Sequence, residues 1–313
     1  MRRNSSRCLN KKVLEADEEF HPKILRKPET TKSEIILDNN EVPLELPLMA
    51  RSVTIINKNY VDASAISSFV NQENNNFYVV GVIGMKDSGK TTLLNLIASG
   101  IYKHEKDSCP VFNELIGGNG IEAFITSNRM ILLDSGAISH NTNAREFINS
   151  EADDFRQIQA LFKLCHELLI VFESHQVMNL IRMIVCAKNM MRHYECDEPV
   201  ITLVENRTQP GTEMSQMTKL SEEILNASHI SNTIYTLQLP DIAKVQSHHG
   251  DPLEIINKLR EDINTRKELK SFEEDSETEK LWLDKLSKLN MEGGELLKLY
   301  EGLREKFYVP HEL

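Results

Sequence analysis

In residues 77–99, FYVVGVIGMKDSGKTTLLNLIAS, an apolar run, a glycine-containing loop and a second apolar run follow one another directly. The loop at residues 84–91 has the pattern G-x-x-x-x-G-K-[ST] of a phosphate-binding loop. The β-branched run before it predicts a buried strand, and the apolar spacing after it predicts a helix that ends at Gly100. Backbone N–H groups and the positive end of the helix dipole would then point at phosphate oxygens. The stretch therefore predicts a nucleotide site.

The pattern of the loop assigns a role to each of its polar residues. We expect Lys90 to reach the outer phosphates and the Thr91 hydroxyl to complete the shell of a magnesium ion. Asp134, at the end of another apolar run, is the carboxylate expected to support that ion. The residues expected to hold the phosphates are Gly84, Lys86, Asp87, Ser88, Gly89, Lys90, Thr91 and Thr92. The expected cofactor is a purine nucleotide (GDP/GTP or ADP/ATP) with Mg²⁺.

Composition narrows the partners and the compartment. The chain has 313 residues, of which 47 are Asp or Glu and 36 are Lys or Arg, so it has no overall basic field for nucleic acid. Its five cysteines form no C-x-x-C pair, which favours a reducing cytosol over a disulfide framework or a zinc site. No apolar run reaches the roughly 18–20 residues that span a bilayer. We therefore expect a cytoplasmic protein that makes no sequence-specific contact with nucleic acid and does not enter a membrane.

Strand and helix signals alternate after residue 77. The strand signals lie at residues 77–83, 121–126, 130–134, 168–172, 199–204 and 233–239, and the helix signals at 91–99, 155–163, 177–191, 214–225 and 252–263. The second and third strands are separated by three polar residues, which predicts a hairpin. The pattern predicts an α/β fold of the P-loop NTPase, G-domain-like type, with a doubly wound, mostly parallel sheet. Its ligand should lie at the carboxyl ends of the strands.

Four segments are expected along the chain. Residues 1–45 predict a flexible N-terminal arm, 46–268 the G-domain-like nucleotide-binding domain, 269–279 an acidic linker and 280–313 a helical C-terminal tail. In the tail, Trp282, Leu286 and Leu289 share one helical face, and Leu296, Leu299, Tyr300, Leu303 and Phe307 share another after Gly293-Gly294. These faces either pack back on the domain or dock on a partner.

The hydrolytic half of a G-domain site is incomplete in this sequence. Hydrolysis needs a switch Thr, an Asp-x-x-Gly motif and a residue that orients water. Asp134 is followed by Ser135-Gly136, so the glycine stands one place early, and no Gln follows it. The connection Gly117–Gly120 contains no Thr, and a lone loop histidine such as His140 is more often merely solvated. We expect no catalytic residues and weak or absent hydrolysis.

The base-reading motif Asn-Lys-x-Asp is also altered. After the strand signal at residues 199–204, Asn206 is present, Arg207 replaces the lysine, and Gln209 stands where the acid would pair with guanine. An amide can neither accept both guanine donors nor repel adenine as a carboxylate does. Asn206 and Arg207 are therefore expected to bind the nucleotide with weak selectivity for the base.

The sequence resembles the SMG-nine family of nonsense-mediated mRNA decay factors. The similarity runs in order from about residue 50 to residue 304, and is carried by residues 77–90, 120–126, 130–134, 169–172, 203–207 and 278–282. The phosphate loop alone is common to very many proteins, so the specificity lies in the ordered set and in the segment around Trp282. The chain departs from this family in its short Gly117–Gly120 connection, which lacks a threonine, and in its short N-terminal arm.

The resemblance implies a G-like domain that holds a nucleotide, lacks the usual hydrolytic and guanine motifs, and forms a heterodimer with an SMG-eight-like protein. That pair would bind and restrain the SMG kinase, a phosphatidylinositol-3-kinase-related enzyme. The leading interpretation is thus a non-catalytic, nucleotide-binding regulatory subunit. Two alternatives stay open: an active dynamin-like GTPase completed by a dimer partner, and a P-loop ATPase or small-molecule kinase.

Overall fold

The computed structural model describes residues 47–57, 60–99, 110–112, 120–138, 147–191, 198–209, 213–241, 252–273 and 276–289. The predicted arm at residues 1–45, the connection at 117–119, His140 and the second apolar run of the tail lie outside these ranges. Among the described helices, none combines the length and the apolar character that crossing a bilayer requires.

Within the described ranges, eight strands form one mixed sheet in the order β2-β1-β4-β5-β3-β6-β7-β8. The strands are β1 Val53–Asn57, β2 Tyr60–Val61, β3 Tyr78–Gly84, β4 Gly120–Ile125, β5 Met130–Ser135, β6 Glu167–Phe172, β7 Val200–Thr208 and β8 Ile234–Pro240. The five strands from β5 to β8 pair in parallel, whereas β4, β1 and β2 pair antiparallel at one edge. Strand β3 lies in the middle and is buried along its whole length. The phosphate loop therefore leaves the sheet at its centre.

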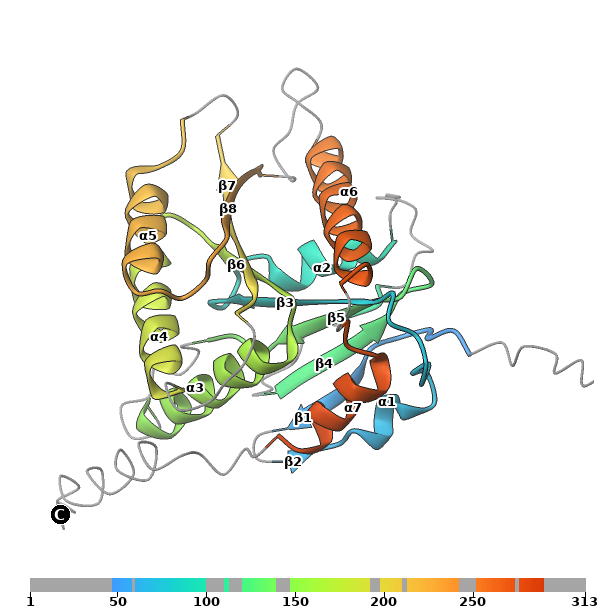
Figure 1. Cartoon of the computed structure of the whole chain (residues 1–313). Coiled ribbons are helices and arrows are strands. Elements are labelled where there is room, and N and C mark those ends of the chain that lie inside the picture. The colour runs from blue at the N-terminus through green and yellow to red at the C-terminus, as the bar shows by residue number, and fades with distance from the viewer. Residues whose placement is uncertain are drawn as a thin grey trace, which may run out of the picture. The chain divides into compact units, whose positions relative to one another are not determined.

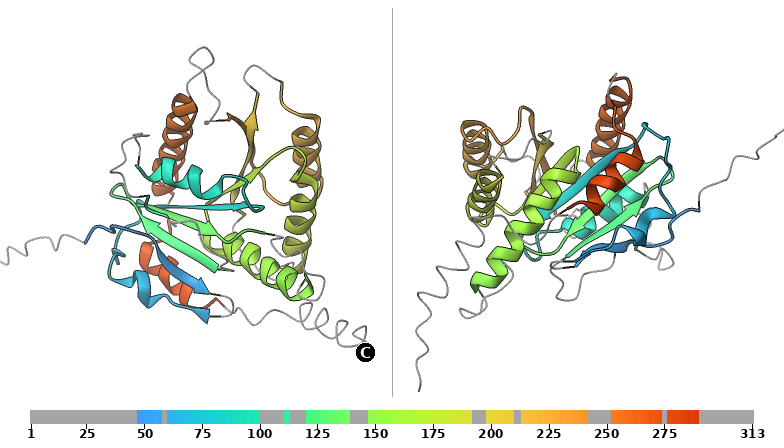
Figure 2. Two further views of the ribbon diagram at one scale, coloured as in Figure 1. Left: turned by 180° about the vertical axis from the view of Figure 1, so that it is seen from behind. Right: turned by 60° about the horizontal axis from the view of Figure 1, so that its bottom comes forward.

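Helices cover both faces of the sheet (Figures 1 and 2). They are α1 Ser64–Ser67, α2 Lys90–Ser99, α3 Phe147–Leu164, α4 Val177–Met190, α5 Gln216–Ala227, α6 Pro252–Ser271 and α7 Glu279–Ser287. Helices α3, α4 and α5 form one row, and α2 lies beside α6 in another. Apolar side chains from the strands and from both rows make up the core, which buries the parallel sheet as such sheets require.

The alternation of strands and helices predicted from the sequence is confirmed, including the antiparallel hairpin of β4 and β5. Four features differ, the last of them in helix α6. The apolar stretch before residue 57 forms strand β1, which pairs with β4 and extends the sheet at its antiparallel edge. Helix α3 begins at Phe147, eight residues before the predicted start. Strand β7 continues through an irregularity to Thr208, so Asn206 and Arg207 belong to the strand rather than to a following loop.

Helix α6 ends at Ser271, well beyond the predicted end at residue 263, and it includes the first residues of the predicted linker. Its later turns contact the domain through charged side chains, which the apolar pattern could not reveal. Arg266 donates to Glu167 at 2.9 Å, and Lys267 donates to the carbonyl of Asn128. The later turns of the helix therefore stay on the domain without burying further apolar residues.

Helix α7, at the start of the predicted tail, packs back on the domain. The side chains of Trp282 and Leu286 are fully buried, and the Trp282 Nε1–H donates to the carbonyl of Leu164 at 3.0 Å. Thr278 caps the helix by accepting from the backbone N–H of Leu281. For this face, packing on the domain is therefore confirmed.

Candidate nucleotide site

The phosphate loop lies between the carboxyl end of β3 and the start of α2, as its pattern predicts. Gly89 has φ +92, and a Cβ at this position would lie 2.3 Å from Nδ2 of Asn206. A Cβ at Gly84 would lie 2.4 Å from the carbonyl oxygen of Val171. Both positions therefore require glycine, the first also because left-handed backbone strains other residues. Asp87 is itself left-handed, with φ 62, a conformation that aspartate tolerates better than most residues.

Lys90 is buried, and its Nζ donates to the carbonyl of Met85 in the same loop at 3.2 Å. Burial lowers the pKa of Lys90, while the carboxylates of Asp134 and Asp87 raise it and offset part of that effect. A positive charge that is held out of water and points into the loop binds an anion more strongly than an exposed lysine does.

Thr91 and Asp134 lie together beneath the loop. The Thr91 hydroxyl, at the start of α2, donates to Oδ2 of Asp134 on β5 at 2.7 Å, so the two residues predicted for magnesium are in direct contact. Burial raises the pKa of Asp134 to about 6, against the opposing effects of the Thr91 hydrogen bond and the Lys90 charge. A cation at this place would restore the ionised form, because a nearby positive charge favours the carboxylate.

The residues present fit a nucleotide with magnesium. Two buried oxygens at the loop, Oγ of Ser88 and Oδ1 of Asp134, have no hydrogen-bond partner among the described residues. Buried polar atoms are normally paired, so both oxygens suit a ligand or its ion. In the described ranges, no group of three or more His, Cys, Asp or Glu side chains is placed to hold a metal ion. Magnesium needs no such group, since phosphates and water supply most of its ligands. Thr91 and Asp134 would hold that ion, which would neutralise phosphate charge.

Asn206 joins the base side of the site to the phosphate loop. Its Nδ2 donates to the carbonyl of Ser88 at 2.8 Å, and its Oδ1 accepts from the backbone N–H of Arg207 at 2.9 Å. Arg207 is left-handed, with φ 56, and its guanidinium pairs with the carboxylate of Glu173 at the end of β6. The structure thus directs these two neighbours to different walls of the site.

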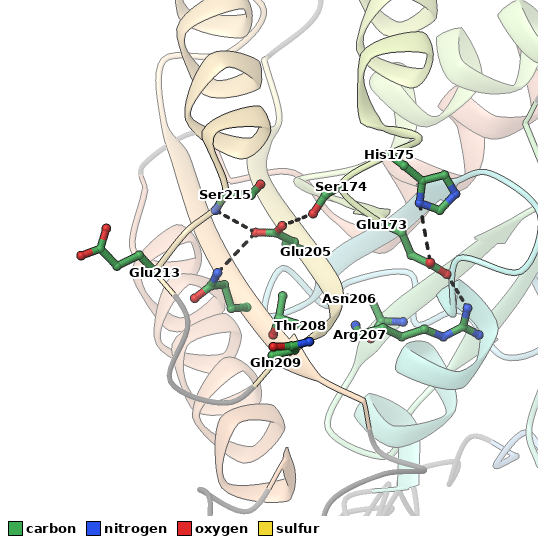
Figure 3. A pocket seen from close by; sticks show the side chains of 11 residues that line it. Glu173, Ser174, His175, Glu205, Asn206, Arg207, Thr208, Gln209, Glu213 and Ser215 are labelled. Atoms are coloured by element: carbon green, nitrogen blue, oxygen red, sulfur yellow. Dashed lines mark hydrogen bonds and ion pairs between the residues drawn. The ribbon is translucent and has the colours of Figure 1, made fainter.

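A cavity of about 390 Å³ opens at the carboxyl ends of β6, β7 and β8 (Figure 3). It is lined by Glu173, Ser174, His175, Glu205, Asn206, Arg207, Thr208, Gln209, Glu213, Ser215 and Gln238. Its size and its place beside the loop suit the base and sugar of a nucleotide. Gln209, at the position expected to read the base, is one of these lining residues.

Glu205 organises the polar side of this cavity. Its carboxylate accepts from the hydroxyls of Ser174 and Thr218, the backbone N–H of Ser215 and the side-chain amide of Gln238. Burial raises the pKa of Glu205, but these hydrogen bonds to the charged form outweigh it and leave the pKa below its usual value. All of these hydrogen-bond partners belong to the protein, so the Glu205 carboxylate holds the wall of the cavity together.

The predicted phosphate-binding residues divide into buried and exposed ones. Ser88 and Lys90 are buried, Gly84 is fully enclosed, and Gly89 and Thr91 are partly buried, whereas Lys86, Asp87 and Thr92 are exposed. Sequence reasoning missed Glu173, Glu205 and Gln238. Their position at the ends of predicted parallel strands is the signal that could have found the first two, since such ends meet at one edge of the sheet.

These features define an α/β P-loop fold of the G-domain type, with the loop at the centre of the sheet and a cavity beside it. No protein-family model matches the chain. The chain is 28% identical over 155 residues to Protein SMG9 of Drosophila melanogaster, a match that covers 42% of this chain and 31% of that protein. It therefore spans about a third of the length of this curated relative.

Solved structures with a similar arrangement include GTP-binding proteins. One is a GTP-binding protein from the hyperthermophilic archaeon Sulfolobus solfataricus in complex with GDP, at 16% identity and a TM-score of 0.38, covering 60% of this chain and 53% of that chain. Another is a variant of SsGBP, at 17% identity and a TM-score of 0.38, covering 64% of this chain and 59% of that chain.

Proposed function

We propose that the chain is a nucleotide-binding regulatory subunit that holds a purine nucleotide with magnesium and hydrolyses it poorly or not at all. The observation that carries the proposal is the hydrogen bond between Thr91 and Asp134 at 2.7 Å, together with a buried Lys90 whose charge interacts with Asp134. This arrangement supplies a phosphate cradle, a lysine and a place for the cation at one end of the sheet.

The lack of efficient hydrolysis is inferred from missing chemical groups. Turnover by this class of protein needs an ordered switch segment and a residue that positions the attacking water. Ser135, Gly136 and Ala137 follow Asp134, and none of them can orient a water as a glutamine side chain does. An intact phosphate half beside an eroded catalytic half favours a nucleotide with a structural role. A ligand that binds only the folded state adds about 2.7 kcal/mol of stability at a hundredfold excess over Kd.

The partner belongs to the same proposal. The family resemblance and the partial similarity to Protein SMG9 support a heterodimer with an SMG-eight-like protein that regulates the SMG phosphatidylinositol-3-kinase-related kinase in nonsense-mediated mRNA decay. In this interpretation the nucleotide stabilises the surface that the partner contacts. Helix α7 would support that surface from within, because its apolar face is already buried on the domain.

Two measurements test the proposal. Mass spectrometry of the small molecules that co-purify with the folded chain should find a purine nucleotide, and a chain that carries none and binds none in calorimetry ends the nucleotide assignment. Turnover should stay far below the rates of activated GTPases, about 1–20 per second, with or without the partner. A rate in that range on adding an SMG-eight-like protein would instead support the GTPase that a partner completes.

The assembly is tested by co-purification with an SMG-eight-like protein. Wild type, Lys90→Ala and a chain truncated after Thr278 should be compared after circular dichroism has shown which of them fold. We expect wild type to pair and Lys90→Ala to pair less well at low nucleotide concentration. If the truncated chain folds and pairs as well as wild type, helix α7 does not support the partner surface. If no SMG-eight-like protein associates with wild type under any condition, the family assignment fails.

A further inference from the structure

The segment that follows Asp134 is hydrogen-bonded on both of its sides. The backbone N–H of Gly136 donates to the carbonyl of Gly120 at 2.8 Å, on the β4 side. The backbone N–H of Ile138 donates to the carbonyl of Gly84 at 3.1 Å, on the side of the phosphate loop. Ile138 also forms a parallel bridge with Met85. Residues 135–138 therefore continue the line of β5 between two neighbours instead of leaving the sheet.

Gln157 adds a second acceptor to the same amide. It lies on α3, is 3% exposed, and its Oε1 accepts from the backbone N–H of Gly136 at 3.1 Å. Its Nε2 is buried and has no hydrogen-bond partner among the described residues. An unpaired buried donor is unfavourable, and an apolar side chain would avoid it. The contribution of glutamine at this position is therefore its oxygen, which holds Gly136.

In nucleotide switches, contacts from the γ-phosphate and its magnesium order the segments beside the site, and hydrolysis releases them. A ligand can shift such an equilibrium only as far as it binds the two conformations differently. Here the backbone N–H of Gly136 already has two acceptors within the protein. A third phosphate would have to displace both acceptors to gain this donor.

We infer that Gln157 is a positioning residue that fixes residues 135–138 in one conformation, so that the segment does not respond to the third phosphate of a bound nucleotide. The inference rests on the proposed function, since it describes how that site treats nucleoside diphosphates and triphosphates. The conformation of residues 135–138 is then the same whether a nucleoside diphosphate or a nucleoside triphosphate is bound.

The test is amide hydrogen exchange of the peptide that covers residues 130–138 in the full chain. The protein is loaded with a purine nucleoside diphosphate or with a non-hydrolysable triphosphate analogue of the same base, each with magnesium. In wild type, exchange at Gly136 should agree within about twofold between the two loaded forms. Exchange that is much slower with the triphosphate would overturn the inference.

Gln157→Met keeps the side-chain length and removes the acceptor. In this variant the amide of Gly136 should exchange faster than in wild type. Its exchange should also be slower with the triphosphate bound than with the diphosphate bound, by about fivefold or more. A purely structural role would raise exchange equally in both loaded forms, and that result would also overturn the inference. Gln159→Ala is the matched control, since Gln159 lies on the same helix but donates to the carbonyl of Ala187 on α4. It should behave as wild type.

The outcomes separate the two proposals. If calorimetry finds that neither nucleotide binds wild type, the proposed function fails and the inference fails with it. If both nucleotides bind and residues 130–138 distinguish them, only the inference fails. Should Gln157→Met not fold by circular dichroism, the wild-type comparison alone decides.

Discussion

The side-chain amide of Asn206 donates to the backbone carbonyl of Ser88 at 2.8 Å, joining residues 118 positions apart. This bond connects the carboxyl end of β7 to the phosphate loop, and the missing side chain of Gly89 leaves the space for it. The loop conformation and the base side of the site therefore depend on each other.

Asn206→Ala should lower both stability and nucleotide affinity. Loss of a part-buried hydrogen bond to a backbone carbonyl costs about 0.5–1.5 kcal/mol of folding free energy. Affinity should fall because the loop then samples conformations that do not bind. Gly89→Ala should also lower stability and nucleotide affinity, because its Cβ would lie 2.3 Å from Nδ2 of Asn206 and displace that side chain. Denaturant unfolding and calorimetry check both, and wild-type affinity in both variants would contradict the coupling.

Lys90→Ala should weaken nucleotide binding by ten- to a hundredfold, corresponding to a charge-assisted contact of about 1.5–3 kcal/mol. Stability without nucleotide should change little or rise, because burial already disfavours the charged ammonium. Lys219→Ala, at an exposed position on α5, is the control and should bind as wild type. Equal affinity of all three proteins in calorimetry would remove Lys90 from the site.

Asp134 should make stability depend on pH when metal and nucleotide are absent. Its folded pKa, about 6, lies above the ordinary value of 3.8, so the folded state binds the proton more tightly than the unfolded state. The stability that the folded protein gains from protonating Asp134 is complete below the ordinary pKa of 3.8. It is lost as pH rises towards 6, which lowers the free energy of unfolding by about 2–3 kcal/mol. Asp134→Asn should flatten this part of the profile in urea titrations at pH 4–7. An unchanged slope in that variant would mean that another group titrates.

Gln209→Asp should shift the preference of the site towards guanine nucleotides. A carboxylate at this position in the cavity wall can accept both guanine donors and repels adenine, which favours GDP over ADP by about tenfold or more. Gln216→Asp adds the same charge at the exposed start of α5 and should leave the ratio of the two affinities unchanged. Competition calorimetry with GDP and ADP measures the ratio. An equal shift in both variants would show that charge, and not base reading, is responsible.

Glu279→Ala should be severely destabilising. The fully buried carboxylate of Glu279 pairs with Arg129 and accepts from the backbone of Asn71 at 2.7 Å and the side chain of Asn74 at 2.6 Å. Removing one partner of a buried pair costs about 3–5 kcal/mol. Glu268→Ala, at an exposed position on α6, should cost less than about 0.5 kcal/mol. Similar midpoints for the two variants in chemical unfolding would show that the pair contributes little.

The sequence predicted the parts of the fold that repeat a local pattern. The strand before Gly84, the loop and the helix from Lys90 were all visible, because each depends on neighbouring residues. Thr91 and Asp134 were each assigned to the magnesium ion from the sequence, and the structure adds that their side chains are hydrogen-bonded to each other. Strand β1 was missed, because its edge role is set by pairing with β4, which no local pattern encodes.

The parts of the site that escaped prediction depend on distant contacts between polar side chains. Gln157 lies in the middle of a helix, and nothing in its neighbours indicates that its amide reaches Gly136. Glu205 stands beside Asn206, yet its hydrogen bonds come from residues on three other segments. Periodicity records which face of an element is buried, but it does not record which polar groups meet there.

The docking of α7 gives the molecule a built-in optical reporter. Trp282 is the single tryptophan of the chain, and its indole is fully buried with its N–H bonded to Leu164 at the end of α3. Tryptophan fluorescence therefore reports on a single location in the chain. Its emission should move to longer wavelength when α7 detaches and the indole is exposed to water. Fluorescence can thus follow the release of α7 separately from global unfolding, which circular dichroism follows in the same sample.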